Sequence, residues 1–257
     1  DYAVYGATNY AIIQGFDNVQ TQEQVLNGIV YLINNCVEGQ PLSDKRVRDA
    51  AAHCLNIEDI AAIASSGAGT PAYNIATPLV EYYADVAEHV TVDVEAANAL
   101  MTEAGYSESN PLPIRLIVVS SYPDWVSACE VVKEMLEQSY FSVTIEQVAD
   151  TSRYFIQDFD IAMLSVGLTT KFNSYAQLYD DSTGLNQSGI DDPDVQAAFA
   201  AMTDEASTQA AMKIATESRA YIPIYYPTSF YAFDANLNPG PYYTQISSFL
   251  YRDFSWK

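Results

Sequence analysis

The chain has 257 residues, of which 49% are hydrophobic and 17% are charged, a composition that indicates a globular protein of one large domain or two small ones. Eleven Lys and Arg residues against 33 Asp and Glu residues give a formal net charge of −22 at pH 7. Such a surface repels phosphate backbones and anionic lipid headgroups, so we expect no nucleic acid partner and expect the acidic surface mainly to favour solubility.

The cysteines and the N-terminus bear on processing. Cys36, Cys54 and Cys129 are odd in number and form no CxxC pair, so we expect buried thiols, with a Cys36–Cys54 bridge as the alternative in an exported chain. No apolar run is long enough to span a membrane, and the N-terminus lacks the pattern of a signal peptide. Because the chain begins without Met and in mid-pattern, we expect a fragment or a processed product.

The stretch 30–60 organises the first part of the chain. An apolar strand is predicted over Gly28–Asn34, and after a polar turn a helix is predicted over Asp44–Leu55. Asn56 is a good cap for a second helix, Ile57–Ala64. A strand that leads into two helices indicates an α/β fold.

The middle of the chain predicts a β-α-β unit. A strand over Leu112–Val119, a helix over Asp124–Gln138 and a strand over Phe141–Val148 favour a parallel strand pair, and a further strand covers Asp160–Val166. The other predicted elements are a strand-like lead-in over residues 1–20, a Gly/Ser/Pro loop over 65–78, helices that begin at Asp93 and Asp192-Pro193 and near Ser207, and an edge or bent strand with two prolines over Tyr221–Phe233.

Motifs for catalysis and metal binding are absent from the sequence. There is no GxSxG, Walker or GxGxxG motif, and His53 and His89 lack the spacing of metal ligands. We therefore predict no catalytic residue, no metal site and no cofactor. The alternative is a hydrolase that uses Asp158 and Asp160, which would share one face of a strand. They lie where that strand begins, however, whereas open α/β sheets bind ligands at the carboxyl ends of strands.

The stretch GIVYLINNCVEGQPLSDKRVRDAAAHCLNIEDI resembles a segment of the family 5 extracellular solute-binding proteins, the oligopeptide, dipeptide and nickel receptors of ABC importers. The positions that match the family pattern pPFsD.rVRqAi.yAiDre.i are Asp44, Val47, Arg48 and Ala50. Leu42 replaces the usual Phe and Asn56 the usual Asp. Later motifs follow in the family's order, so the resemblance covers about residues 28 to 234.

The resemblance implies a fold and a domain organisation. It implies an α/β lobe of the type II periplasmic-binding-protein kind, with a central mixed sheet flanked by helices. Residues 21–226 would form the second, ligand-binding lobe, residues 1–20 a flanking piece of a missing first lobe, and residues 227–257 a return segment toward that lobe.

The resemblance also implies a function. The protein would capture a peptide or peptide-like solute outside the membrane by closure of two lobes and deliver it to the permease subunits of an ABC importer. It would be extracellular or periplasmic and tethered to the membrane as a lipoprotein. A surface adhesion or sensing protein that has kept the receptor fold is a further alternative.

The predicted ligand site follows the strand Asp160–Val166. Peptide-binding relatives carry a pattern W.aD..dP there, and their Asp pairs with the amino group of the peptide; in this chain Val166 stands for the Trp and Thr169 for the Asp. A receptor for a sugar or a metal chelate is therefore an alternative. The candidate ligand-binding residues are Val166, Gly167, Thr169, Lys171, Phe172 and Asn186.

Overall fold

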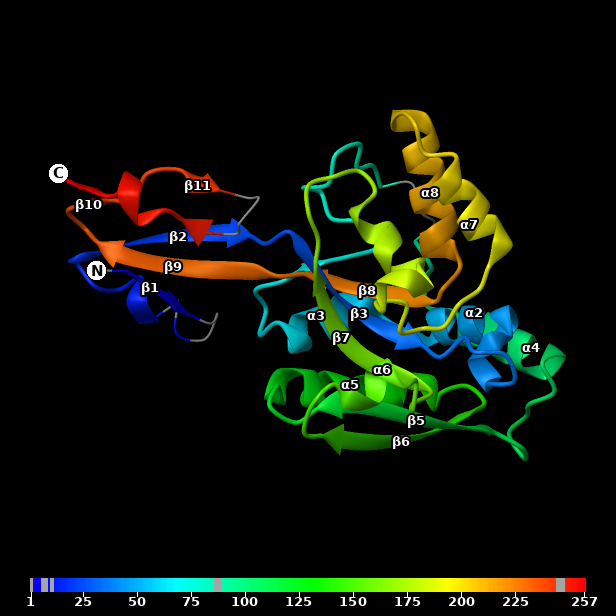
Figure 1. Cartoon of the computed structure of the whole chain (residues 1–257). Coiled ribbons are helices and arrows are strands. Elements are labelled where there is room, and N and C mark those ends of the chain that lie inside the picture. The colour runs from blue at the N-terminus through cyan, green and yellow to red at the C-terminus, as the bar shows by residue number, and fades with distance from the viewer. Residues whose placement is uncertain (1, 6–8, 10–11, 86–88, 244–247) are drawn as a thin grey trace.

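The computed structural model describes residues 2–5, 9, 12–85, 89–243 and 248–257. A six-stranded mixed sheet of order β4-β8-β3-β7-β5-β6 forms the larger part of the molecule, and a three-stranded antiparallel sheet of order β1-β9-β2 lies beside it (Figure 1). The strands of the larger sheet are β3 (Gly28–Asn34), β4 (Thr70–Pro71), β5 (Leu112–Val119), β6 (Phe141–Val148), β7 (Ile161–Gly167) and β8 (Tyr221–Tyr226).

Strand β3 lies in the middle of the larger sheet and is buried along its whole length. It pairs antiparallel with β7 on one side and with β8 on the other. Val30 and Leu32 belong to one hydrophobic cluster, and Ile29, Tyr31 and Ile33 belong to a second cluster on the opposite face. An apolar run without alternation is what a strand needs when both of its faces are covered.

Helices cover both faces of this sheet (Figure 1). The helices on the face of Val30 and Leu32 are α2 (Lys45–Cys54), α3 (Ile57–Ala64), α4 (Val94–Glu103) and α5 (Pro123–Leu136). The other face is covered by α6 (Ser152–Phe155), the 3-10 helix η2 (Ser174–Tyr179), α7 (Pro193–Ala200) and α8 (Glu205–Glu217). Side-chain caps fix the first turns of several helices. Asn56, as predicted, caps α3, because its side-chain oxygen accepts a hydrogen bond from the backbone N–H of Asp59.

The predicted β-α-β unit is confirmed. Strands β5 and β6 pair in parallel from Leu112↔Phe141 to Val119↔Val148, and α5 connects them. Strand β7 also runs parallel to β5. The carboxyl ends of β5 and β7 therefore lie at the same edge of the sheet, and this is the edge where open α/β sheets bind ligands.

The smaller sheet consists of β1 (Tyr2–Tyr5), β2 (Val19–Val25) and β9 (Thr228–Asp234). The rings of Tyr231 and Phe233, both on β9, pack against Phe249 in an aromatic cluster. The last short strands are β10 (Leu237–Asn238), β11 (Tyr242–Tyr243), β12 (Ser248–Phe249) and β13 (Ser255–Trp256). The lead-in predicted over residues 1–20 lies partly outside the described residues, and the predicted boundary at residue 21 falls inside β2.

The single strand predicted over Tyr221–Phe233 is wrong, although the bend expected from its prolines is present. It is two strands, β8 and β9, which belong to different sheets and meet at Pro227. Proline has no N–H to donate to a strand ladder, so it ends one strand and allows the chain to turn toward the other sheet.

Two stretches of chain cross side by side from one sheet into the other. Strand β2 continues through Leu26 and Asn27 into β3, and β8 continues through Pro227 into β9. These stretches run antiparallel, and the N–H of Leu26 donates a hydrogen bond to the carbonyl of Pro227 at 2.8 Å. We refer to residues 26–27 and 227 as the crossovers.

The three cysteines are buried and unpaired, as expected. Cys36 and Cys54 belong to clusters on opposite faces of the larger sheet, so the alternative bridge between them does not form. Burial raises the pKa of the Cys36 thiol to about 11 and those of Cys54 and Cys129 to about 12, which keeps them protonated.

Within the described ranges, no helix has both the length and the apolar character needed to cross a bilayer.

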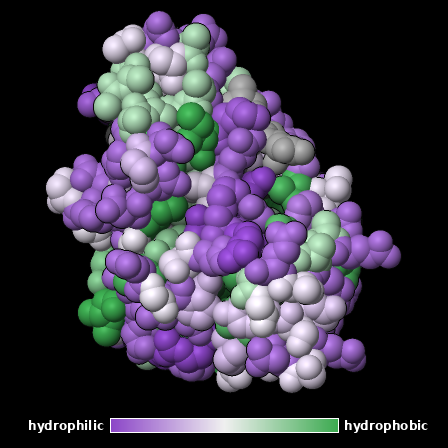
Figure 2. Space-filling view, turned by 90° about the vertical axis from the view of Figure 1, so that its right-hand side faces the viewer, coloured by the Kyte–Doolittle hydropathy of each residue, from purple (hydrophilic) through white to green (hydrophobic). Residues whose placement is uncertain are grey.

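The face that carries α7 and α8 is largely hydrophilic, with a weakly hydrophobic area at its top (Figure 2). At the junction of the two helices Ala200, Ala201 and Ala206 are exposed. Each exposes little apolar area, so this surface needs no covering partner.

Arg48 ties α2 to the end of α8 and provides a test of the fold. It is 5% exposed, and its guanidinium donates to the carbonyls of Ser218 at 2.9 Å, Leu42 at 2.8 Å and Ser43 at 2.9 Å. We expect Arg48→Met to lower the free energy of unfolding by about 3 kcal/mol, because it leaves buried carbonyls without donors.

The measurement is urea unfolding followed by circular dichroism. The control is Lys45→Met on the same helix, which removes only an exposed pair with Asp49 and should cost no more than about 0.5 kcal/mol. Equal losses in the two variants would show that the Arg48 contacts do not stabilise the fold.

Candidate ligand-binding site

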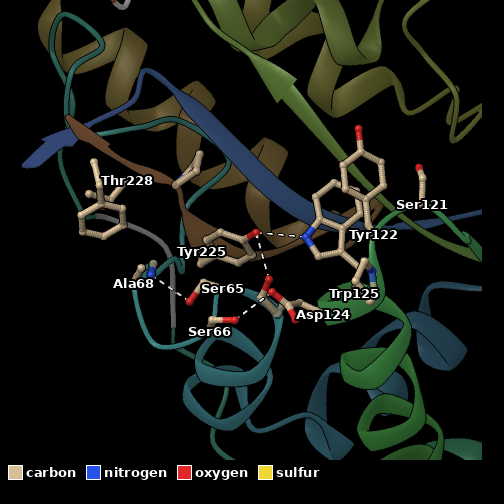
Figure 3. A pocket seen from close by; sticks show the side chains of 14 residues that line it. Ser65, Ser66, Ala68, Ser121, Tyr122, Asp124, Trp125, Tyr225 and Thr228 are labelled. Atoms are coloured by element: carbon tan, nitrogen blue, oxygen red, sulfur yellow. Dashed lines mark hydrogen bonds between the residues drawn. The ribbon is translucent and has the colours of Figure 1, made fainter. Parts of the chain in front are cut away.

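A pocket of about 360 Å³ lies at the carboxyl end of β5 (Figure 3). Three parts of the chain form it: the loop between α3 and β4, the start of α5, and the stretch from β8 into β9. Its lining residues are Ala64, Ser65, Ser66, Ala68, Gly69, Ser121, Tyr122, Pro123, Asp124, Trp125, Tyr225, Pro227, Thr228 and Phe230. The pocket thus touches both sheets and one crossover.

Trp125 and Tyr225 form the fixed inner wall of the pocket. Trp125 is 7% exposed and its indole Nε1 donates to the hydroxyl of Tyr225 at 3.0 Å. That hydroxyl donates in turn to the carbonyl of Ala64 at 3.3 Å, at the end of α3. Burial raises the pKa of Tyr225, so the hydroxyl keeps its proton for this bond. The chain of hydrogen bonds joins α5, β8 and α3.

Tyr122 and Asp124 form the outer part of the pocket, beside the first turn of α5. The Tyr122 ring stacks on Trp125 with centroids 4.4 Å apart and stays 50% exposed. The hydroxyl of Ser66 donates to Oδ2 of Asp124 at 2.8 Å (Figure 3). Among the described residues that line the pocket, Asp124 alone carries a charge. The site combines exposed aromatic surface with a carboxylate.

Five of the predicted site residues lie together at the carboxyl end of β7. Val166 and Gly167 end the strand, and the next residue, Leu168, donates its N–H to the carbonyl of Asn27 at 2.7 Å. The loop is therefore fastened to a crossover. The side chain of Val166 packs against the cluster of Ile29 and Tyr31, which is on the opposite face of the sheet from Trp125.

Thr169, Lys171 and Phe172 form a rim beyond that strand. Thr169 and Lys171 are exposed, and the hydroxyl of Ser174 donates to the carbonyl of Thr169 at 2.9 Å. The ring of Phe172 lies against Tyr82 with centroids 6.0 Å apart. The structure thus adds Tyr82, from a distant part of the sequence, to the predicted group.

Asn186 does not join this group. Its loop meets β3 and β8 at the other end of the larger sheet, where Ser188 accepts a hydrogen bond from the N–H of Cys36. The buried Asn186 amide donates to Asp181 Oδ1 at 2.8 Å and to the carbonyl of Ile190 at 3.0 Å, and its oxygen accepts from Ser188 at 2.9 Å. Its hydrogen-bonding groups are used within its own loop.

The sequence analysis did not single out Trp125, Tyr225 or Asp124. A sequence signal for Asp124 and Trp125 was present, because Pro-Asp-Trp opens a helix three residues after a buried strand, which places both side chains at the carboxyl end of β5. Tyr225 carried no such signal, since one of twenty tyrosines inside an apolar strand looks like core packing.

Asp158 and Asp160 are held by arginines and do not form an acid–base pair. Asp158 accepts from Arg115 at 2.8 Å and from Arg153 at 2.8 Å, and these hydrogen bonds hold the pKa of its carboxyl below the usual range. Asp160 accepts the backbone N–H of Arg115 at 2.7 Å. Both precede β7, at the end of the sheet opposite the pocket, and the described ranges contain no cluster of His, Cys, Asp or Glu suited to a metal ion.

Comparison with known proteins gives two kinds of match. Residues 1–189 match the family model of bacterial extracellular solute-binding proteins, family 5. The dipeptide-binding protein of Escherichia coli (strain K12) is 39% identical over 75 residues, which cover 29% of this chain and 14% of that protein.

Solved structures share the fold along the whole chain. The substrate-binding protein CtaP of Listeria monocytogenes has a TM-score of 0.87 at 16% identity, over 100% of this chain and 56% of that protein. NikA of Staphylococcus aureus, in complex with Ni(L-His)2, has a TM-score of 0.81 at 17% identity, over 100% of this chain and 57% of that protein. This chain therefore spans little more than half the length of these proteins.

Gly69 allows Tyr225 to reach Trp125. A Cβ at Gly69 would lie 2.8 Å from Cγ of Tyr225 and 2.9 Å from Cβ of Ser65, closer than van der Waals contact allows. We expect Gly69→Ala to displace the Tyr225 ring, weaken its bond to Trp125 and lower the free energy of unfolding by about 1 to 3 kcal/mol. Intrinsic tryptophan fluorescence and thermal unfolding measure the two effects.

The matched control is Gly167→Ala at the end of β7, where nothing lies within 4 Å of the added carbon. This variant should keep the wild-type tryptophan spectrum and change stability by less than about 1 kcal/mol. A normal spectrum in Gly69→Ala would contradict the close packing of Gly69 against Tyr225.

Proposed function

Because the chain belongs to family 5 of the bacterial extracellular solute-binding proteins, we propose that it forms a ligand-binding part of a receptor that delivers a peptide or peptide-like solute to an ABC importer. Proteins of this family are non-enzymatic components of transport systems, and the capture of a solute needs no covalent chemistry. The receptor would bind its solute outside the membrane, and a lipid anchor would hold it near the permease.

The observation that carries this proposal is the position of the pocket between the two sheets. A solute there contacts Tyr225 on the larger sheet and Thr228 and Phe230 on β9. It also lies beside Pro227, where the chain crosses from one sheet to the other. Binding would therefore favour one relative orientation of the two sheets, which is how a ligand drives hinge closure.

The crossovers suggest how the lobes are divided. We propose that the larger sheet and its helices, within residues 21–226, form the second lobe. Residues 1–20 and 227–257 would then belong to a first lobe, together with the rest of β2, which pairs with β9 beyond the crossovers. The partners in this arrangement are the first lobe of the same protein, the solute and the permease subunits.

A peptide solute is favoured over a metal chelate by one comparison. The curated relative with 39% identity over 75 residues is a dipeptide-binding protein. The likeness to NikA, at 17% identity, is a likeness of fold. A nickel–histidine chelate is accordingly the competing solute to include in a binding experiment.

Thr169 provides a test of the peptide proposal. In the complete protein, Thr169→Asp would supply a carboxylate at the rim. If the amino group of a bound peptide lies at the rim, affinity for Ala-Ala should rise about tenfold, because a charge-assisted hydrogen bond contributes about 1.5 to 3 kcal/mol and exposure to water reduces this value. Isothermal titration calorimetry measures the change.

The control is Thr203→Asp, which adds the same charge at an exposed position between α7 and α8, away from the site. It should leave the affinity for Ala-Ala unchanged. If wild-type protein binds Ni(L-His)2 but no di- or tripeptide, the peptide proposal is wrong. If peptides bind and Thr169→Asp changes no affinity, the rim does not contact the amino group.

A further inference from the structure

Asp124 is a carboxylate in the pocket that its protein neighbours do not neutralise. Its Oδ2 accepts from the hydroxyl of Ser66 at 2.8 Å, a neutral donor, and no hydrogen bond to Oδ1 comes from the described part of the chain. No Lys or Arg is among the described lining residues. By contrast Asp158, at the other end of the sheet, is bound by two arginines. The negative charge of Asp124 is therefore available to a solute.

The position of Asp124 orients this carboxylate. It is the second residue of α5, a helix of 14 residues, and lies beside the helix N-terminus. The hydrogen bond from Ser66 fixes one oxygen toward the α3–β4 loop. The carboxylate is thus held in place at the mouth of the pocket (Figure 3).

Aromatic rings beside Asp124 favour a cation over other groups. Tyr122 stacks on Trp125 with an interplanar angle of 23° and stays half exposed, so the stacked pair presents ring surface at the mouth. Aromatic faces attract ammonium groups, and the attraction grows when closure excludes water. The net charge of −22 also steers a cationic solute toward the protein.

We propose that Asp124, with the stacked rings of Tyr122 and Trp125, binds the ammonium group of the solute. This inference rests on the proposed function and specifies it: the carboxylate for the amino group comes from the start of α5, whereas the rim after β7 carries Thr169 instead. The ammonium group is either the α-amino group of a peptide or a lysine side chain.

The experiment separates these two sources. Wild-type and Asp124→Asn forms of the complete protein are titrated calorimetrically with Ala-Ala, N-acetyl-Ala-Ala and N-acetyl-Lys-Ala. Asp124→Asn should weaken the peptide that carries the recognised ammonium group by about ten- to hundredfold. It should change binding of N-acetyl-Ala-Ala by less than about threefold, because that peptide has no ammonium group. A loss confined to Ala-Ala identifies the α-amino group, and one confined to N-acetyl-Lys-Ala the side chain.

The chain offers a closely matched control. Asp194 is also the second residue of a helix that begins with proline, and it too is exposed. Asp194→Asn removes the same charge from the same helical position outside the pocket, and it should leave all three affinities unchanged. Equal weakening of all three peptides by Asp124→Asn would indicate a change of pocket shape and overturn the proposal.

Butylammonium is a second probe, which tests the Asp124 subsite independently of the proposed function. If wild-type protein binds no peptide, the peptide proposal fails, but binding of butylammonium still tests the subsite. A saturable shift of the Trp125 indole N–H resonance that is lost in Asp124→Asn supports the subsite, with the exposed Trp256 as internal reference. No shift in the wild-type protein overturns it.

Discussion

Strand β3 must be apolar on both faces, because it lies between two layers of helices with no side chain exposed to water. Val30 and Leu32 reach the cluster under α2, α3 and α5, while Ile29 and Tyr31 reach the cluster under η2 and α8. Its two neighbours, β7 and β8, take their register from it. The carboxyl end of β7 and the start of β9, which lines the pocket, are therefore placed by the same strand.

Elements with strong local signals were predicted well from the sequence. β3, α3, β5 and β6 have the predicted bounds, because apolar runs and an Asn cap determine them locally. The family resemblance of the stretch 28–60 is confirmed by the family match. The break between β8 and β9 was missed because it depends on which sheet each half joins, which is a long-range property.

The candidate site was harder to predict, for a related reason. Asp124, Ser66 and Tyr225 are far apart in the sequence and come together only when α3, α5 and β8 pack around one edge of the sheet. The predicted rim residues lie together because they follow one strand. Asn186 follows the rim in the sequence, but the chain between them crosses to the other end of the sheet, where its amide supports a turn.

Three arginines that bind partners within the fold lie away from the pocket. Arg48 binds backbone carbonyls inside the fold, and Arg115 and Arg153 bind Asp158 and its neighbours. These guanidinium groups stabilise the larger sheet and its helices at positions away from the pocket. The charge that remains at the mouth is negative, although no concentration of acidic residues is needed there.

The hydrogen bond between the crossovers has a mechanical consequence. The N–H of Leu26 donates to the carbonyl of Pro227, and proline has no N–H with which to return a bond. The contact is thus a single backbone hydrogen bond between the crossovers, in contrast to the ladders of β2 with β9 and of β3 with β8 on either side of it. Torsion concentrated at this link would turn the two crossovers as a unit, so that a change of angle between the sheets would have one principal axis.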